Sequence, residues 1–115
     1  MATFKRFKAS VGSPSSSPAP ETVYTVPATK TSVVTGLTVS NVSDFDLPVD
    51  IFVTVGTDDF YLAKGLRLGP GEQKRLTGME KMVLEADDVL KSDAPTVDGG
   101  TTDTFVVWLS VYEDV

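Results

Sequence analysis

The sequence predicts an all-β fold, an antiparallel β-sandwich of the jelly-roll or immunoglobulin type with about seven or eight short strands. Apolar and polar residues alternate along several Val- and Thr-rich segments, as they do in strands with one buried face. Turn signals such as Gly69-Pro70-Gly71 separate these segments at intervals of about ten residues. No long segment has the apolar spacing of a helix, which argues against βαβ units and a parallel sheet. A small barrel is the alternative arrangement of the same strands.

The first two expected strands, 22–26 and 30–41, are rich in Thr and Val. Pro27 ends the first, because proline has no backbone N–H to donate to a ladder. In the second strand, alternate positions are expected to share one face. Those positions are Val33, Leu37, Val39 and Asn41.

The third expected strand, 49–55, has the clearest alternation in the chain. A hairpin turn at 56–59 leads from it into a fourth strand at 60–63. The apolar positions of the third strand are Val49, Ile51, Val53 and Val55.

The second half of the domain is expected to continue as strands, with an acidic turn at 85–88. Apolar residues within 79–89 also have roughly helical spacing, so one short helical turn there is the alternative. The expected strands are 72–76, 81–84, 89–91 and 103–113.

Two regions of different composition are visible along the chain. Residues 1–20 are expected to form an extended N-terminal arm, because its second part, GSPSSSPAP at 12–20, disfavours both helix and strand. Residues 21–115 are expected to form the β-sandwich domain. The total of 115 residues is enough for one domain with a single modest core.

Charge and composition exclude several classes of function. The net charge is −6, so the chain has no general attraction for nucleic acid or anionic membranes, and neither is an expected partner. No apolar run approaches the ~20 residues of a membrane helix, and the N-terminus lacks the apolar region of a secretory signal. Because the chain has no Cys, disulfides are excluded. Without Cys or His, thiolate and imidazole metal sites are excluded too, and no cofactor is expected.

The same absence argues against an enzyme, since Ser/His/Asp and Cys/His arrangements cannot be built. Two adjacent carboxylate pairs, Asp58-Asp59 and Asp87-Asp88, offer oxygen ligands of the kind that Ca²⁺ prefers. Their spacing does not match a calcium loop, so solvated turn residues are the preferred interpretation. We therefore expect no catalytic residue and no metal site.

The last expected strand is apolar on both faces. Phe105, Val107, Leu109 and Val111 alternate and are expected to point into the core. The opposite face carries Trp108 and Tyr112, where a solvated strand would be polar. Phe52 likewise lies opposite the apolar face of 49–55. We expect Phe52, Trp108 and Tyr112 to anchor a protein–protein interface, formed with other copies of the same chain. Two alternatives remain open: the arm or a loop covers these rings, or Trp108 lies in the core.

The N-terminus mixes cations with aromatic rings, in the order Phe4, Lys5, Arg6, Phe7 and Lys8. An arm of this kind could add a strand to the sheet edge of a neighbouring subunit, with the Ser/Pro linker setting its reach. Phe4, Arg6 and Phe7 are therefore expected interface residues. Stacking on nucleic-acid bases and an arm without a partner are the alternatives.

The order of the segments resembles that of small virion proteins of tailed bacteriophages. The resemblance begins with TVYTVPA at 22–28 and TSVVTGLTVSN at 31–41, and it covers about 22–113. Later matching segments are YLAKG at 61–65, LGPG at 68–71, KMVL at 81–84 followed by ADD at 86–88, and VWLSVYE at 107–113.

The resemblance implies a non-enzymatic accessory subunit located in the virion and assembled in the host cytoplasm. Proteins of this group are capsid decoration or cement, neck, or small tail proteins, and they act by packing against other virion proteins. Homo-oligomers, trimers among them, are implied as well. The long Ser/Pro linker and Trp108 depart from the group pattern. They leave open whether the chain lies on the capsid surface, the neck or the tail. A carbohydrate- or host-receptor-binding module on the virion is the alternative, with surface aromatics stacking on sugars.

Overall fold

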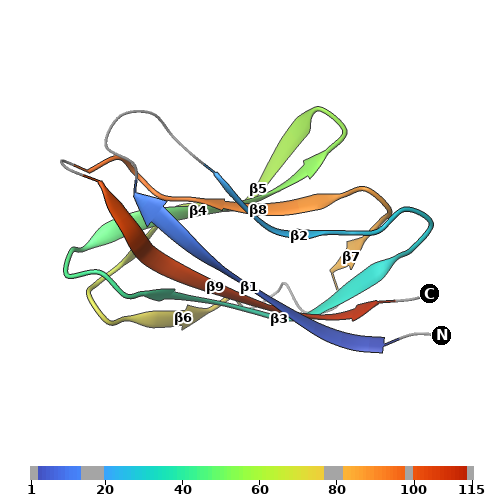
Figure 1. The fold of residues 1–115 in the computed structure, drawn as a ribbon, viewed down its shortest axis with the longest axis horizontal. Coiled ribbons are helices and arrows are strands. Elements are labelled where there is room, and N and C mark those ends of the chain that lie inside the picture. The colour runs from blue at the N-terminus through green and yellow to red at the C-terminus, as the bar shows by residue number, and fades with distance from the viewer. Residues whose placement is uncertain (1–2, 14–19, 77–81, 98–99, 114–115) are drawn as a thin grey trace.

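Two antiparallel sheets pack face to face as a β-sandwich in the computed structural model, which describes residues 3–13, 20–76, 82–97 and 100–113 (Figure 1). One sheet has the strand order β1-β9-β3-β6, with β7 also paired to β3, and the other has the order β2-β8-β4-β5. The described residues form nine strands and no helix, which confirms the predicted fold class. The strands are β1 (Thr3–Ser13), β2 (Glu21–Thr25), β3 (Ser32–Asn41), β4 (Leu47–Val55), β5 (Asp58–Leu68), β6 (Gln73–Arg75), β7 (Val83–Leu84), β8 (Val89–Asp93) and β9 (Thr101–Glu113).

The core lies between the sheets and is built by period-two alternation. All four apolar residues expected on the inner face of β9 are fully buried. On the facing sheet, Val49 and Ile51 of β4 and Leu90 of β8 are buried against them. Burying each such side chain stabilises the fold by about 1.5–3 kcal/mol, which holds the two layers together without a disulfide. The β9 residues are Phe105, Val107, Leu109 and Val111.

A bulge in β3 changes the face of Val33. The pairing of β3 with β9 shifts between Val34 and Gly36, so one extra residue is inserted there. Leu37 and Val39 after the bulge are buried as expected, whereas before it Val34 points inward. The expectation that Val33 shares their face is therefore wrong, and Val33 lies opposite Tyr112 on the outer face.

The segment expected as an arm belongs to the sandwich where it is described. Residues 3–13 form β1, which pairs with β9 from Thr3↔Glu113 to Val11↔Phe105. Val11 is fully buried in the core, and Ala9 packs against it. The expected boundary at residue 20 therefore does not separate this strand from the domain. Most of the Ser/Pro linker, 14–19, lies outside the described residues.

The alternative helical turn within 79–89 is absent from the described part of that segment. Residues 83–84 form β7 and 85–88 include the acidic turn, while 79–81 lie outside the described residues. No helix long and apolar enough to cross a membrane occurs in the part of the chain that the structure describes.

Candidate functional site: the outer face of the β1–β9–β3 sheet

Pairing of β1 and β3 with β9 gathers aromatic side chains on the outer face of their sheet. Phe4 lies opposite Tyr112, and Lys8 lies opposite Trp108, so each pair projects from the same side of the sheet. The rings of Phe4 and Tyr112 touch, with centroids 4.6 Å apart. Phe4, Tyr112 and Trp108 are 75%, 38% and 39% exposed. The structure thus presents three aromatic side chains to solvent on one face.

Arg6 belongs to the same face and lies over the indole of Trp108. Its guanidinium carbon is 5.2 Å from the ring centroid, within the range of a cation–π contact. Among the described residues, no carboxylate pairs with Arg6 or Lys8. The cationic groups of both side chains are therefore available to a partner.

Two hollows lined by described residues lie beside this cluster. The first has a volume of about 470 Å³ and is lined by Phe4, Lys5, Arg6, Thr35 and Ser110 of the described residues, with Val111 beneath. Ser110 pairs with Gly36 at the β3 bulge, and two such small residues leave the space open between larger neighbours. The second hollow, about 340 Å³, is lined in part by Val106 and Trp108. Trp108 therefore lies beside a hollow that a partner side chain could enter.

The described charged side chains on the strands of the outer face are all cationic. By register, Arg6, Lys8 and Arg75 point outward with Trp108 and Thr38. Among the strand residues of this face whose side chains the structure describes, none is Asp or Glu. A chain with net charge −6 thus carries a cationic, aromatic face.

Two of the expected interface residues lie elsewhere. Phe7 points inward, stacks on Tyr24 with centroids 4.3 Å apart, and packs against the core. Phe52 is on the other sheet and only 4% exposed, because Tyr61, its partner across β4 and β5, covers it. The expected set of six is therefore reduced to four neighbours on one face: Phe4, Arg6, Trp108 and Tyr112.

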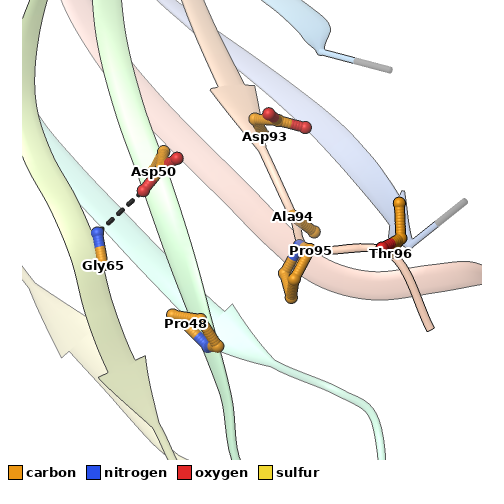
Figure 2. A pocket seen from close by; sticks show the side chains of 7 residues that line it. All are labelled: Pro48, Asp50, Gly65, Asp93, Ala94, Pro95 and Thr96. Carbon is orange, nitrogen blue, oxygen red and sulfur yellow. Dashed lines mark hydrogen bonds between the residues drawn. The ribbon is translucent and has the colours of Figure 1, made fainter. Parts of the chain in front are cut away.

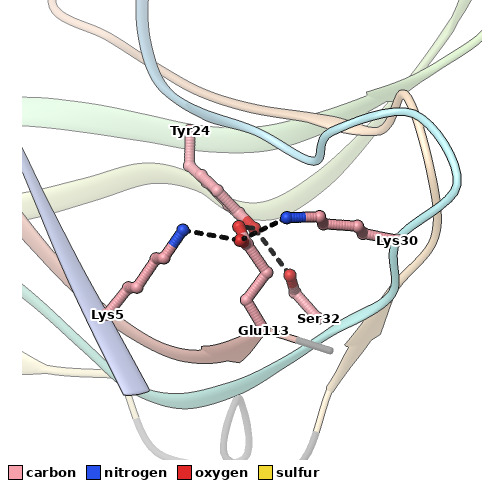
Figure 3. Close-up of polar contacts among 5 residues, drawn as sticks. All are labelled: Lys5, Tyr24, Lys30, Ser32 and Glu113. Atoms are coloured by element: carbon pink, nitrogen blue, oxygen red, sulfur yellow. Dashed lines mark hydrogen bonds and ion pairs between the residues drawn. The ribbon is translucent and has the colours of Figure 1, made fainter. Parts of the chain in front are cut away.

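A buried polar cluster fixes the strands beneath this face (Figure 3). Glu113, 1% exposed at the end of β9, accepts hydrogen bonds from Nζ of Lys5 at 2.8 Å and from the Tyr24 hydroxyl at 2.6 Å. The Tyr24 hydroxyl is also 2.6 Å from Oγ of Ser32, and Nζ of Lys30 is 3.7 Å from the carboxylate. The cluster joins β1, β2, β3 and β9.

The contacts within the cluster shift the pKa values of Glu113 and Tyr24. Hydrogen bonds from Lys5 and then Tyr24 hold the pKa of Glu113 below its ordinary value, despite burial. Burial, and then the hydrogen bond with Glu113, raises the pKa of Tyr24 to about 12. Glu113 is therefore a carboxylate and Tyr24 a neutral phenol at neutral pH, which is the arrangement that the hydrogen bonds require.

A third feature is an acidic recess on the opposite sheet (Figure 2). It is a hollow of about 340 Å³ whose lining includes Asp50, Gly65 and Asp93. Asp50 turns toward Gly65 and accepts a hydrogen bond from its backbone N–H at 2.7 Å. One oxygen of Asp93 is buried without a hydrogen-bond partner among the described residues. Burial, followed by the charge of Asp50, raises the pKa of Asp93. In the described part of the chain, no group of three or more acidic residues could hold a metal ion.

Fold and face together define a β-sandwich domain with one cationic, aromatic outer face. No family model and no curated protein sequence matches the chain. One similar solved structure is that of infectious bursal disease virus, Gt strain: the match covers 98% of this chain, with 13% identity and a TM-score of 0.46. The chain spans about a third of the length of that viral chain, since the match covers 32% of it.

Proposed function

We propose that the chain is a non-enzymatic structural subunit of a virus particle that packs against neighbouring subunits through the outer face of its β1–β9–β3 sheet. The observation that carries the proposal is the clustering of Phe4, Arg6, Trp108 and Tyr112 on that face. The inner face of the same strands already supplies the core, so these four side chains are not needed to fill it.

The composition of the cluster suits a contact between proteins. Trp, Tyr and Arg are the residues that most often dominate binding energy at interfaces, because they bury a large area with few rotatable bonds. The Arg6–Trp108 contact holds both side chains in place before a partner arrives, which reduces the entropy lost on binding. A patch of ordinary size, about 800 Å² on each partner, would include the whole cluster.

The viral setting is supported by the order of segments across 22–113, which resembles small virion proteins of tailed bacteriophages. In that setting the chain would act as a capsid decoration or cement protein, or as an accessory subunit of the neck or tail. It would stabilise the particle by adding buried area between subunits. We extend the proposal to a homo-oligomer, because an accessory subunit repeats with the symmetry of its particle.

Mass spectrometry of purified particles tests this function. We expect peptides of the chain in the particle at a constant ratio to its major protein, through density-gradient purification and a salt wash. Particles assembled with the Tyr112→Ser variant should retain less of the chain, and those with Tyr61→Ser, on the other sheet, should retain the normal amount. Absence of the chain from purified particles would overturn the proposed function.

A further inference from the structure

We propose that the neighbour which docks on this face offers a carboxylate-rich protein surface, and that one of its Asp or Glu side chains enters the hollow beside Arg6. The inference rests on the proposed function in taking the neighbour to be a protein subunit.

Among the described residues that line the hollow between Phe4 and Arg6, one cation has no carboxylate partner. Lys5 also lines it, but its Nζ is already 2.8 Å from the buried carboxylate of Glu113. Arg6 has no carboxylate partner in the described structure, and its guanidinium lies over the Trp108 ring. A guanidinium held in this way keeps its N–H fork for a bidentate pair with a carboxylate. The hollow, about 470 Å³, has room for such a side chain.

The charges around the hollow favour the same partner. Three of the chain's ten basic residues lie on this face, and its described strand residues include no acid. Face-to-face packing of two copies would bring these cations together, which opposes a symmetric dimer through this surface. An acidic patch on a different subunit surface would instead complement them.

A polyanion such as nucleic acid is less well suited to the face than a short acidic patch. Affinity for nucleic acid depends on neutralising many phosphates along a strand, whereas this chain has net charge −6. Beyond the face, its carboxylates would repel the rest of a long polyanion. A protein surface can present a few carboxylates within the area of the face and avoid that repulsion.

The chain contains its own reporter for this contact. Trp108 is the only tryptophan, so intrinsic fluorescence comes from the proposed interface. We would titrate the purified chain with a short poly-L-glutamate peptide at low ionic strength, with poly-L-lysine and polyuridylate as comparison probes. The expected result is a saturable change in Trp108 emission with poly-L-glutamate that weakens as salt is added.

Two matched variants locate the binding. Arg6→Gln should weaken poly-L-glutamate binding roughly tenfold or more, as loss of a charge-assisted hydrogen bond predicts. Lys64→Gln removes the same charge from a residue whose Nζ lies 4.6 Å from the Tyr61 ring, on the other sheet, and should leave affinity within about twofold. Thermal unfolding would show that both variants remain folded.

Three results would overturn the inference: no response to poly-L-glutamate, equal weakening in the two variants, or tighter binding of polyuridylate with the same dependence on Arg6. The last would identify a nucleic-acid face. If the chain is present in particles but does not bind poly-L-glutamate, the acidic partner alone is refuted. If Arg6-dependent binding is found for a chain absent from particles, the viral function is refuted and the chemistry of the face stands.

Discussion

Nζ of Lys5 lies 2.8 Å from Oε1 of Glu113, and this contact ties β1 to the end of β9. Tyr24 reaches the other oxygen of the same carboxylate from the opposite sheet at 2.6 Å. The position of β1, and with it of Phe4 and Arg6, therefore depends on a buried carboxylate as well as on the ladder with β9.

The coupling between Tyr24 and Glu113 can be measured by a double-mutant cycle. Tyr24→Phe and Glu113→Gln should each lower the free energy of unfolding in urea, with a coupling energy of about 1–2 kcal/mol, as for residues sharing one hydrogen-bond network. As a control, Arg67→Ala breaks an exposed ion pair with Asp46 at 3.2 Å and should cost no more than about 1 kcal/mol. A coupling near zero would mean that the hydrogen bond contributes no net stability.

Acid should weaken the fold through Glu113. Its pKa is lower in the folded state than the ordinary value of 4.5, so the unfolded chain binds the proton more readily. The contribution is fully present above pH 4.5 and is lost as the pH falls through the lowered pKa of Glu113. Urea unfolding from pH 7 to pH 3 should show this loss, and Glu113→Gln should flatten it. A variant with an unchanged acid limb would contradict the assignment.

Deprotonation of Tyr24 should weaken the fold at alkaline pH. Its pKa rises from 10.0 to about 12 on folding, so its contribution is fully present below pH 10.0 and is lost as the pH rises through about 12. Alkaline unfolding should therefore begin above pH 10.0, and Tyr24→Phe should reduce its pH dependence.

Asp93→Asn should stabilise the domain at pH 7. The pKa of Asp93 is raised by burial, so its contribution is present below its ordinary value of 3.8 and lost as the pH rises through the raised pKa. At neutral pH the charged, partly unpaired carboxylate is unfavourable, and an amide should raise the free energy of unfolding by about 1 kcal/mol. The exposed Asp44→Asn variant, which removes the same charge, should change it by less than about 0.5 kcal/mol. A destabilised Asp93→Asn would contradict this account.

Trp108 and Leu109 are adjacent on β9 and point to opposite faces of the sheet. Trp108→Ala should mainly weaken assembly, whereas Leu109→Ala should mainly lower the free energy of unfolding. Leu109 is fully buried, so its truncation should cost about 2–5 kcal/mol in urea unfolding. Trp108 points outward, so its truncation should cost about 1 kcal/mol or less, yet lower the amount of chain bound to particles. Equal destabilisation by the two variants would show that the indole serves the fold.

The residues on the inner faces of the long strands could be predicted, because apolar side chains occur there at every second position. Phe105 to Val111 in β9 follow this pattern without interruption, and Val49, Ile51 and Val53 in β4 follow it although Phe52 between them is buried too. The same alternation continues to Glu113, so the burial of this residue had a sequence signal. Its partners Lys5 and Tyr24 had none, because they come from strands whose packing only the tertiary structure defines.

Other features were hidden by competing signals. In β1, Phe7, Ala9 and Val11 alternate as the inner face of a strand does. The cations beside them drew attention to charge instead, and so favoured the interpretation as an arm. The bulge that turns Val33 outward lies at Gly36, and an isolated glycine in a strand is a signal for a bulge. Phe52 was expected at an interface because the register that places Tyr61 over it cannot be read from local sequence.

Hydroxyl-radical footprinting of the particle, compared with the isolated chain, tests most directly whether this face is the one that contacts neighbours. Phe4, Trp108 and Tyr112 should lose reactivity in the particle, because a partner covers their face. Phe60 and Tyr61, 56% and 46% exposed on β5 of the other sheet, serve as internal controls and should stay reactive. Unchanged reactivity of Trp108 and Tyr112, with protection of Phe60 and Tyr61, would contradict the account and assign the contact to the opposite sheet.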